Sequence, residues 1–305
     1  MTRESFLKKS LLTAAGLYLT PGLVSASGNQ MLMKTIPSTG EQIPAIGMGS
    51  WLTFNVGESE HERAPMRNVL MEFIKQGGRV IDSSPMYGRS EQVIGELAAE
   101  LEVTDKLWVA TKVWTQGKAA GKGQIENSLG YFRKWPSVLQ VHNLVDLDTH
   151  LETLQSLKEE GKLKYVGVTH YLDHAHKQLA EIIKKEKLDF IQINLSVRNA
   201  AAEDYLLPLA ADRGVAVIIN QPFETGGLFN YIQGVSLPAW AKEYGINSWA
   251  AYFLKYIISN PAVTCTIPAT TQVAHVKENM AACYGELPDQ ATRIKMKDYF
   301  KKNAL

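Results

Sequence analysis

Four residues whose side chains can hold or move a proton lie in the first half of the chain: Asp82, Tyr87, Lys112 and His142. Lys112 is the most informative, because it lies in the mainly apolar run 107–113 and a buried ammonium is costly unless an anion meets it. Asp82 is the anion that the sequence offers. A lysine–aspartate pair beside a tyrosine favours the tyrosinate. We therefore expect the pKa of Tyr87 to fall from about 10 toward the range in which an acid–base catalyst works.

Each of these residues alone has a simpler explanation. An aspartate at the end of a strand commonly caps a helix, and a tyrosine commonly packs against its neighbours. The hypothesis of acid–base chemistry at Asp82 and Tyr87 therefore depends on a fold that brings the four side chains together.

Apolar, strand-like runs alternate with amphipathic helical runs from residue 45 to residue 283. Strands that are apolar on both faces and alternate with helices indicate a parallel sheet covered on each side. Eight such strands favour an α/β fold of the closed (β/α)8 TIM barrel type over an open, doubly wound sheet, and no Gly-x-Gly-x-x-Gly follows any of them. The predicted strands are Ala45–Gly49, Arg79–Asp82, Leu107–Lys112, Val138–His142, Tyr165–Thr169, Phe190–Asn194, Val215–Asn220 and Val263–Ile267.

The segment before the first strand predicts a small β-hairpin, 31–37 paired with 41–46, that plugs the lower end of the barrel. No linker rich in Pro, Gly or Ser interrupts the repeat, so we expect residues 31–305 to form a single domain. The predicted helices include 65–76, 90–102, 149–160, 174–187, 201–213 and a last helix at 290–302.

In a (β/α)8 barrel the residues just past the C-terminal end of each strand converge on one mouth. Asp82, Lys112 and His142 end three successive predicted strands, so they must lie near one another there. Tyr87 follows Asp82 by five residues and lies within reach of the same opening. The other strands end at Ser50–Trp51, Thr169–His170, Gln192, Asn220–Gln221 and Pro268–Thr270.

The charge balance excludes some partners. Lys and Arg number 32 against 31 Asp and Glu, for a net charge of +1. Nucleic acids and acidic membrane surfaces need a concentrated basic face, so neither is expected as the main partner. Cys265 and Cys283 are expected to be buried free thiols rather than a disulfide. No metal site is expected, because His170, His174 and His176 fit the polar start of a helix better than a set of ligands.

The first thirty residues have the pattern of an export signal. Three basic residues within 1–9 precede a short apolar stretch, 11–19, and a small-residue exit at 24–26. The apolar stretch is too short to span a membrane. We expect 1–30 to be a secretory or twin-arginine-like signal peptide, and the mature protein to be exported or periplasmic without stable membrane insertion. The alternative is an uncleaved N-terminal helix on a cytoplasmic protein.

Several segments, in the same order along the chain, resemble the aldo-keto reductase family. Residues 80–95 resemble the signature around the catalytic aspartate and tyrosine of that family. The resemblance covers residues 31–285 and implies the barrel predicted above. The segments similar to the lysine strand, the histidine strand, the next helix-to-strand connection and the cofactor segment are 110–113, 139–143, 161–169 and 267–279.

This resemblance implies an NAD(P)H-dependent enzyme that reduces an aldehyde or ketone with hydride from a nicotinamide cofactor. Tyr87 would donate the proton to the carbonyl oxygen. Lys112, paired with Asp82, would lower the pKa of that tyrosine. His142 would orient the substrate carbonyl.

The resemblance also implies a set of cofactor-binding residues. Gln192 matches a residue that hydrogen-bonds the nicotinamide carboxamide, whereas Asn220 stands where a stacking tyrosine is common. Ala269 and His275 stand where many members hold the adenosine 2′-phosphate with Lys and Arg. By family habit we expect NADP(H) in preference to NAD(H). The full set is Ser50, Trp51, Thr169, His170, Gln192, Asn220, Pro222, Phe223, Pro268, Ala269, Thr270, His275, Glu278 and Asn279.

Two other functions are open to this sequence. Lys112 can form a Schiff base in a barrel lyase. The barrel can also bind a dinucleotide without turning it over, as a sensor or accessory protein, although such a module needs no tyrosine acid. The expected substrate pocket contains Trp51, Trp114 and His142, and a wide mouth with Trp51, Trp114 and Phe223 nearby favours an apolar or aromatic aldehyde or ketone.

Overall fold

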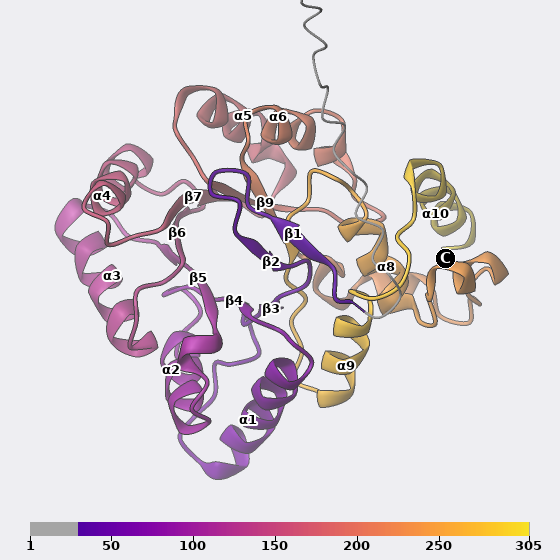
Figure 1. Ribbon diagram of the computed structural model, residues 1–305, viewed down its shortest axis with the longest axis horizontal. Coiled ribbons are helices and arrows are strands. Elements are labelled where there is room, and N and C mark those ends of the chain that lie inside the picture. The colour runs from indigo at the N-terminus through magenta and orange to yellow at the C-terminus, as the bar shows by residue number, and fades with distance from the viewer. Residues whose placement is uncertain (1–29, 305) are drawn as a thin grey trace, which may run out of the picture.

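The computed structural model describes residues 30–304 and contains a barrel of eight parallel strands (Figure 1). The strands follow one another in chain order, from β3 to β10. Isolated parallel bridges from Ile46 to Thr266 and from Gly49 to Ala269 join the first strand to the last. The predicted (β/α)8 architecture is therefore confirmed. The strands are β3 (Met48–Gly49), β4 (Val80–Asp82), β5 (Trp108–Val113), β6 (Val138–His142), β7 (Tyr165–Thr169), β8 (Phe190–Asn194), β9 (Ala216–Asn220) and β10 (Cys265–Thr266).

The two strands at the closure, β3 and β10, are shorter than the predicted runs 45–49 and 263–267. The chain still bonds across this seam, because the Gly47 N–H donates to the carbonyl oxygen of Thr266 at 2.8 Å. A Cβ atom on Gly47 would lie 2.8 Å from the carbonyl oxygen of Val80. On the other side of this segment, the backbone of β4 therefore lies too close for a side chain at position 47.

Helices cover the outside of the barrel and follow the strands along the chain (Figure 1). The predicted helix 201–213 is wrong in its first half, where a 3-10 turn at Ala201–Glu203 precedes α6. Pro208 explains the break, because proline lacks an N–H and its ring clashes with the carbonyl four residues earlier. The helices are α1 (Glu60–Lys75), α2 (Ser90–Glu100), α3 (Lys118–Phe132), α4 (Leu147–Glu159), α5 (His176–Lys185), α6 (Leu206–Asp212), α7 (Leu228–Tyr231), α8 (Trp249–Ile258), α9 (Val273–Ala281) and α10 (Gln290–Asn303).

The predicted hairpin is present as β1 (Met33–Thr35) and β2 (Gln42–Pro44), which pair antiparallel and lie across one end of the barrel (Figure 1). Ile43 of β2 is fully buried in an apolar layer that includes Trp108 and Tyr165. Those two residues begin β5 and β7, so the hairpin packs against the N-terminal ends of the strands. It plugs the end of the barrel opposite the C-terminal mouth.

Both cysteines are buried and free, as expected. Burial raises the pKa of the Cys283 thiol to about 12 and that of Cys265 well above its usual range. The thiolate is the reactive form of cysteine. Both side chains are therefore packing elements of the core.

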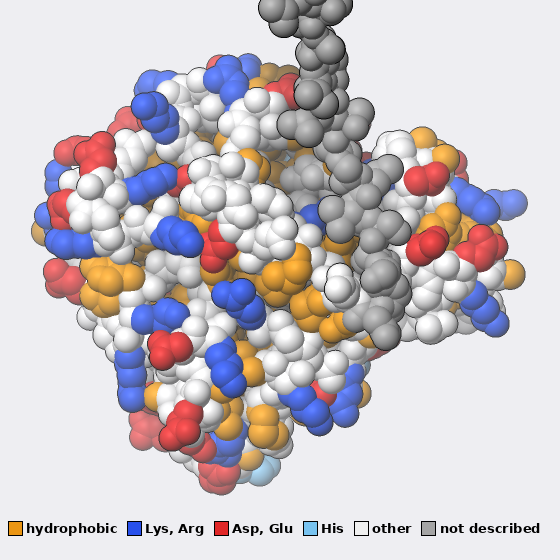
Figure 2. Space-filling model, in the orientation of Figure 1, with side chains coloured by type: hydrophobic (Ala, Val, Ile, Leu, Met, Phe, Trp, Pro, Cys, Tyr) orange, Lys and Arg blue, Asp and Glu red, His pale blue; other side chains and the backbone are white. Residues whose placement is uncertain are grey.

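The predicted signal peptide falls on residues 1–30, of which 1–29 lie outside the described residues. Among the described helices, none is long and apolar enough to cross a membrane. On the face drawn in Figure 2, Lys and Arg side chains alternate with Asp and Glu over the described residues, so this face carries no field of a single sign.

Candidate active site

Neighbouring strands carry the predicted catalytic residues to one end of the barrel. Asp82 is the last residue of β4, Lys112 lies in β5, and His142 is the last residue of β6. The register places Ala110 opposite Asp82 and Gln140 opposite Lys112. Since side chains two residues apart on a strand share one face, this register sets the lysine just beyond the aspartate. The three side chains therefore meet at the mouth.

The ammonium of Lys112 is fully engaged. Its Nζ donates hydrogen bonds to the two carboxylate oxygens of Asp82, at 2.9 and 2.8 Å, and to the carbonyl oxygen of Ser83, at 2.6 Å. Lys112 is 1% exposed and Asp82 is 2% exposed. Burial is the largest single effect on the pKa of Lys112 and would lower it, but the charges of Asp82 and Tyr87 and the hydrogen bonds to them together raise this pKa. The predicted ion pair is present, and the lysine stays charged.

Tyr87 lies in the loop after β4, with its ring centroid 5.1 Å from the Nζ of Lys112. Burial raises the pKa of Tyr87, and the opposing effect of Lys112 is smaller. The predicted net fall of this pKa is therefore wrong. Removing the phenolate from water destabilises it more than the nearby charge of Lys112 stabilises it. Tyr87 keeps its proton at neutral pH, which is the form that a proton donor needs.

The imidazole of His142 meets the Tyr87 ring edge to face, with centroids 5.9 Å apart and planes at 84°. Burial, followed by the charge of Lys112, lowers the pKa of His142 to about 2. The imidazole is therefore neutral at neutral pH. Trp114 lies beside it, with ring centroids 6.5 Å apart, but it is 39% exposed and borders the opening rather than lining the cavity.

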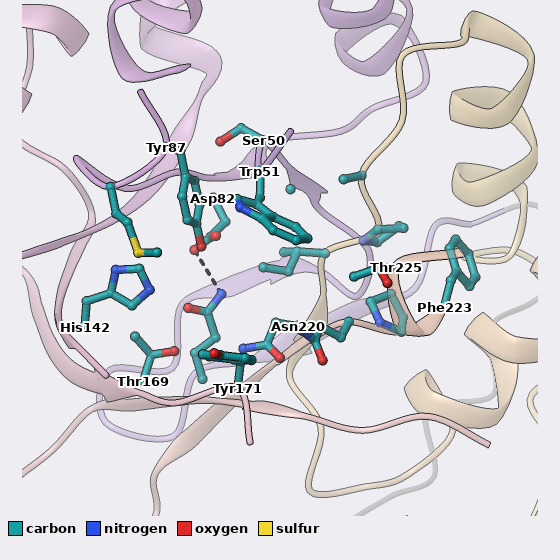
Figure 3. A pocket seen from close by; sticks show the side chains of 18 of the residues that line it. Ser50, Trp51, Asp82, Tyr87, His142, Thr169, Tyr171, Asn220, Phe223 and Thr225 are labelled. Atoms are coloured by element: carbon teal, nitrogen blue, oxygen red, sulfur yellow. Dashed lines mark hydrogen bonds between the residues drawn. The ribbon is translucent and has the colours of Figure 1, made fainter. Parts of the chain in front are cut away.

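A cavity of about 350 Å³ opens beside these residues (Figure 3). Tyr87, Trp51 and His142 reach it from different strand ends, as the sticks in Figure 3 show. The charged side chain in its lining, Asp82, is already paired with Lys112. The predicted site residues that line the cavity are Ser50, Trp51, Asp82, Tyr87, His142, Thr169, Gln192, Asn220, Pro222, Phe223, Pro268 and Ala269.

Buried amides in this lining fit a nicotinamide. The side-chain oxygens of Asn143 and Asn220 have no hydrogen-bond partner among the described residues, and an unpaired buried acceptor costs about 1–3 kcal/mol. Gln192, which was predicted to bind the carboxamide, lines the cavity, and its amide also donates to Asp82 at 3.0 Å and accepts from Gln140 at 3.4 Å. Asn220 therefore offers a fully open acceptor for a carboxamide NH2 group, and the Gln192 amide, which also supports the aspartate, keeps one N–H and one lone pair free of these two bonds.

Five predicted cofactor residues lie apart from the cavity lining. A hydrogen bond of 3.2 Å joins the Oγ1 of Thr270 to the Nδ1 of His275, at the start of α9. The ring of His170 lies parallel to that of Tyr171, with centroids 5.6 Å apart. A ligand that runs from the cavity past Ala269 to α9 would have to be extended, as a dinucleotide is. The five residues are His170, Thr270, His275, Glu278 and Asn279.

Sequence reasoning missed several residues at the site, among them Tyr171 and Ser84. Tyr171 lines the cavity next to Asn220 (Figure 3). The sequence could have indicated Tyr171, because it follows the last residue of β7, Thr169, by two positions and therefore points to the same side of the chain, toward the mouth of the barrel. Ser84 lies two residues past Asp82, with its Oγ 2.9 Å from the Nδ1 of His142. Ser84 follows another serine in a turn, and nothing in that pattern indicates that its hydroxyl contacts a histidine.

A buried carboxylic acid lies behind the site, on α2. Glu91 accepts hydrogen bonds from the hydroxyls of Thr111 and Ser128, and burial raises its pKa from 4.5 to about 7. The native state therefore holds this proton more tightly than the unfolded chain does, and stability falls as the pH rises through that window. We expect Glu91 to make the free energy of unfolding about 2–3 kcal/mol lower at pH 8 than at pH 5.

Urea unfolding of Glu91→Gln at both pH values measures this effect. The variant should lose the difference that Glu91 causes, whereas Glu126→Gln, at an exposed position on α3, should keep it. A Glu91→Gln variant with the wild-type pH dependence would contradict the assignment.

A barrel whose mouth combines a protonated tyrosine, a charged lysine–aspartate pair and a neutral histidine defines an enzyme that transfers protons in an apolar cavity. Among the described residues, no group of three or more His, Cys, Asp or Glu side chains is arranged to hold a metal ion. The family model described as "Aldo/keto reductase family" matches residues 45–296. The chain belongs to this family and is an oxidoreductase, as the sequence resemblance implied.

Known relatives agree with this membership. The chain is 26% identical over 250 residues to the NADH-specific methylglyoxal reductase of Escherichia coli, covering 69% of this chain and 73% of that protein. It is 22% identical over 240 residues to an aldehyde reductase of Saccharomyces cerevisiae, covering 68% and 74%. An aldo/keto reductase from Klebsiella pneumoniae, solved with NADP and acetate, has the same fold, with a TM-score of 0.74, 24% identity and coverage of 88% and 96%.

Proposed function

We propose that the protein reduces an aldehyde or ketone to the alcohol with a nicotinamide cofactor, and that Tyr87 is the proton donor. The observation that carries this proposal is the buried pair of Lys112 and Asp82 directly beneath a protonated tyrosine. In such an arrangement the tyrosine holds a proton that it can donate, and the lysine stabilises the tyrosinate that remains after the proton has left. Membership of the aldo/keto reductase family supports the same reaction.

Each residue has a distinct task in this reaction. Hydride for the carbonyl carbon is the contribution of the nicotinamide when it is bound. The Tyr87 hydroxyl donates its proton to the carbonyl oxygen as negative charge develops there. The ammonium of Lys112 then stabilises the tyrosinate, and Asp82 keeps that ammonium charged in a site with little water. His142, which is neutral, orients the carbonyl oxygen beside the tyrosine.

We propose NADP(H) in preference to NAD(H) as the cofactor. A structural neighbour from Klebsiella pneumoniae was solved with NADPH, whereas the E. coli relative is named as NADH-specific. In this chain Asn220 would accept from the carboxamide, and Thr270, His275 and Asn279 would lie toward the adenosine end. His275 is exposed at the start of α9, where a helix N-terminus also favours a negative group.

The walls of the cavity define the class of carbonyl compound. No Lys or Arg is among the residues that line it, so a carboxylate or phosphate on the substrate would find no cation there. Large apolar side chains at the opening are partly exposed, namely Trp51, Met86, Trp114 and Tyr171. We therefore propose an uncharged aldehyde or ketone with a bulky apolar or aromatic group.

Reduction of a substrate panel tests the proposal. Loss of reduced-nicotinamide absorbance should be fastest with an uncharged aromatic aldehyde. It should be about tenfold slower or more, measured as kcat/KM, with an aldehyde of similar size that carries a carboxylate, because burying an unpaired charge is costly. Equal rates would contradict the substrate class, and absence of turnover with every carbonyl and both cofactors would contradict the reaction.

The two alternative functions are not favoured. A Schiff base requires a neutral lysine amine, but Asp82 and Ser83 hold the donors of Lys112 and its pKa is raised. A binding module without turnover would not require a tyrosine beside that ion pair. Borohydride treatment with substrate should therefore leave Lys112 unmodified.

We also propose that the protein is exported, with 1–30 as the signal. The basic head, short apolar stretch and small-residue exit support this proposal. Isolation of the protein from its native host and sequencing of its first residues provides the test. An intact Met1 on the protein in the cytoplasm would contradict export.

A further inference from the structure

The turn after β4 holds a serine against the histidine of the site. Ser84 is fully buried, and its Oγ lies 2.9 Å from the Nδ1 of His142. The same Oγ accepts a hydrogen bond of 3.2 Å from the backbone N–H of Met86. A single buried hydroxyl thus connects the aspartate-bearing loop to the end of β6.

The hydrogen-bond capacity of Ser84 decides the direction of this contact. A hydroxyl has one proton to donate and two lone pairs to accept. The Met86 N–H uses an accepting position, and the Nδ1 of His142 is the other hydrogen-bond partner of this hydroxyl among the described residues. A buried donor left unpaired costs about 1–3 kcal/mol. Ser84 therefore donates to Nδ1.

The consequence for His142 follows from its charge state. Burial lowers the pKa of His142 to about 2, so the ring carries a single proton at neutral pH. If Nδ1 accepts from Ser84, that proton sits on Nε2. His142 lines the cavity, and Nε2 is the ring nitrogen that remains for a ligand. In the other tautomer a lone pair on Nε2 would face the lone pairs of a carbonyl oxygen.

We propose that Ser84 is a positioning residue that fixes His142 as the Nε2–H tautomer, so that the histidine donates a hydrogen bond to the substrate carbonyl oxygen. The part of this inference that concerns the substrate rests on the proposed carbonyl reduction. The proton consumed in the reaction still comes from Tyr87, and His142 keeps its own. The serine acts only through the imidazole and does not touch the reacting atoms.

Nitrogen-15 NMR of the full-length protein, labelled at histidine, tests the tautomer without any substrate. The wild-type spectrum should show Nε2 protonated and Nδ1 unprotonated for His142, assigned by its absence in His142→Gln. Ser84→Ala should shift this pattern toward a mixture of tautomers, and Ser84→Thr should restore it. Ser90→Ala removes another buried hydroxyl, one that donates to the carbonyl oxygen of Ser50, and should leave the His142 pattern unchanged.

Kinetics complete the test. Ser84→Ala should lower kcat/KM for carbonyl reduction about tenfold, as expected for a lost neutral hydrogen bond, with unchanged dinucleotide affinity, and Ser84→Thr should recover most of the rate. A wild-type His142 protonated on Nδ1, or a Ser84→Ala variant with the wild-type spectrum, would overturn the inference. If no carbonyl compound is reduced, the proposed function fails, while the spectrum still decides the tautomer.

Discussion

Replacing Tyr87 by phenylalanine is expected to lower kcat for carbonyl reduction about 10³-fold, within the range that a positioned general acid contributes. The substitution removes the proton that the carbonyl oxygen needs and keeps the ring that packs against His142. The affinity for the dinucleotide should change little, because Asn220 and the other amides of the lining are untouched. Single-turnover reduction and fluorescence titration of the cofactor measure the two quantities separately.

The control for this variant is Tyr131→Phe, which removes the hydroxyl from a tyrosine that is 41% exposed on α3. That substitution should leave kcat unchanged. A Tyr87→Phe variant that reduces the substrate at the wild-type rate would refute the assignment of the proton donor.

Replacing Lys112 by methionine is expected to damage stability and catalysis together. The change leaves the carboxylate of Asp82 buried with only the amide of Gln192 beside it. Breaking a buried ion pair from one side costs about 3–5 kcal/mol, and the loss of the cation also removes the group that stabilises the tyrosinate. Urea unfolding should show the destabilisation, and activity should fall to the level of Tyr87→Phe.

A double variant separates these two effects. Lys112→Met combined with Asp82→Asn removes both charges, so its free energy of unfolding should lie closer to wild type than that of Lys112→Met alone. Its activity should stay as low, because the cation is still missing. A double variant as unstable as the single one would show that packing of the lysine stem, rather than the unpaired carboxylate, sets the cost.

The barrel and its central ion pair were predictable because the pattern behind them is local. The buried strands are continuous apolar runs, and a lysine inside one of them requires an anion nearby. Asp82 and Lys112 lie at matching ends of neighbouring strands once the alternation of strands and helices is recognised. The bounds of β5 to β9 accordingly agree with the predicted runs to within one residue at each end.

The features that were missed depend on distances between segments far apart in sequence. The net rise in the pKa of Tyr87 arises from burial by several loops, and no single motif records that burial. The hydrogen bond from Gln192 to Asp82 was not predicted, because it depends on the curvature of the barrel. The contact of Ser84 with His142 joins residues 58 positions apart and depends on the shape of one turn.

The hairpin at the base of the barrel has a consequence for repeated turnover. Among the described residues, Ile43, Trp108 and Phe190 fill that end with buried apolar side chains, whereas the cavity beside the phenol opens at the C-terminal mouth. In the proposed reaction each catalytic cycle uses one phenolic proton, which solvent at the mouth would then replace. Departure of the alcohol and reprotonation of the tyrosine would then use the same mouth, so a slowly leaving product would delay both.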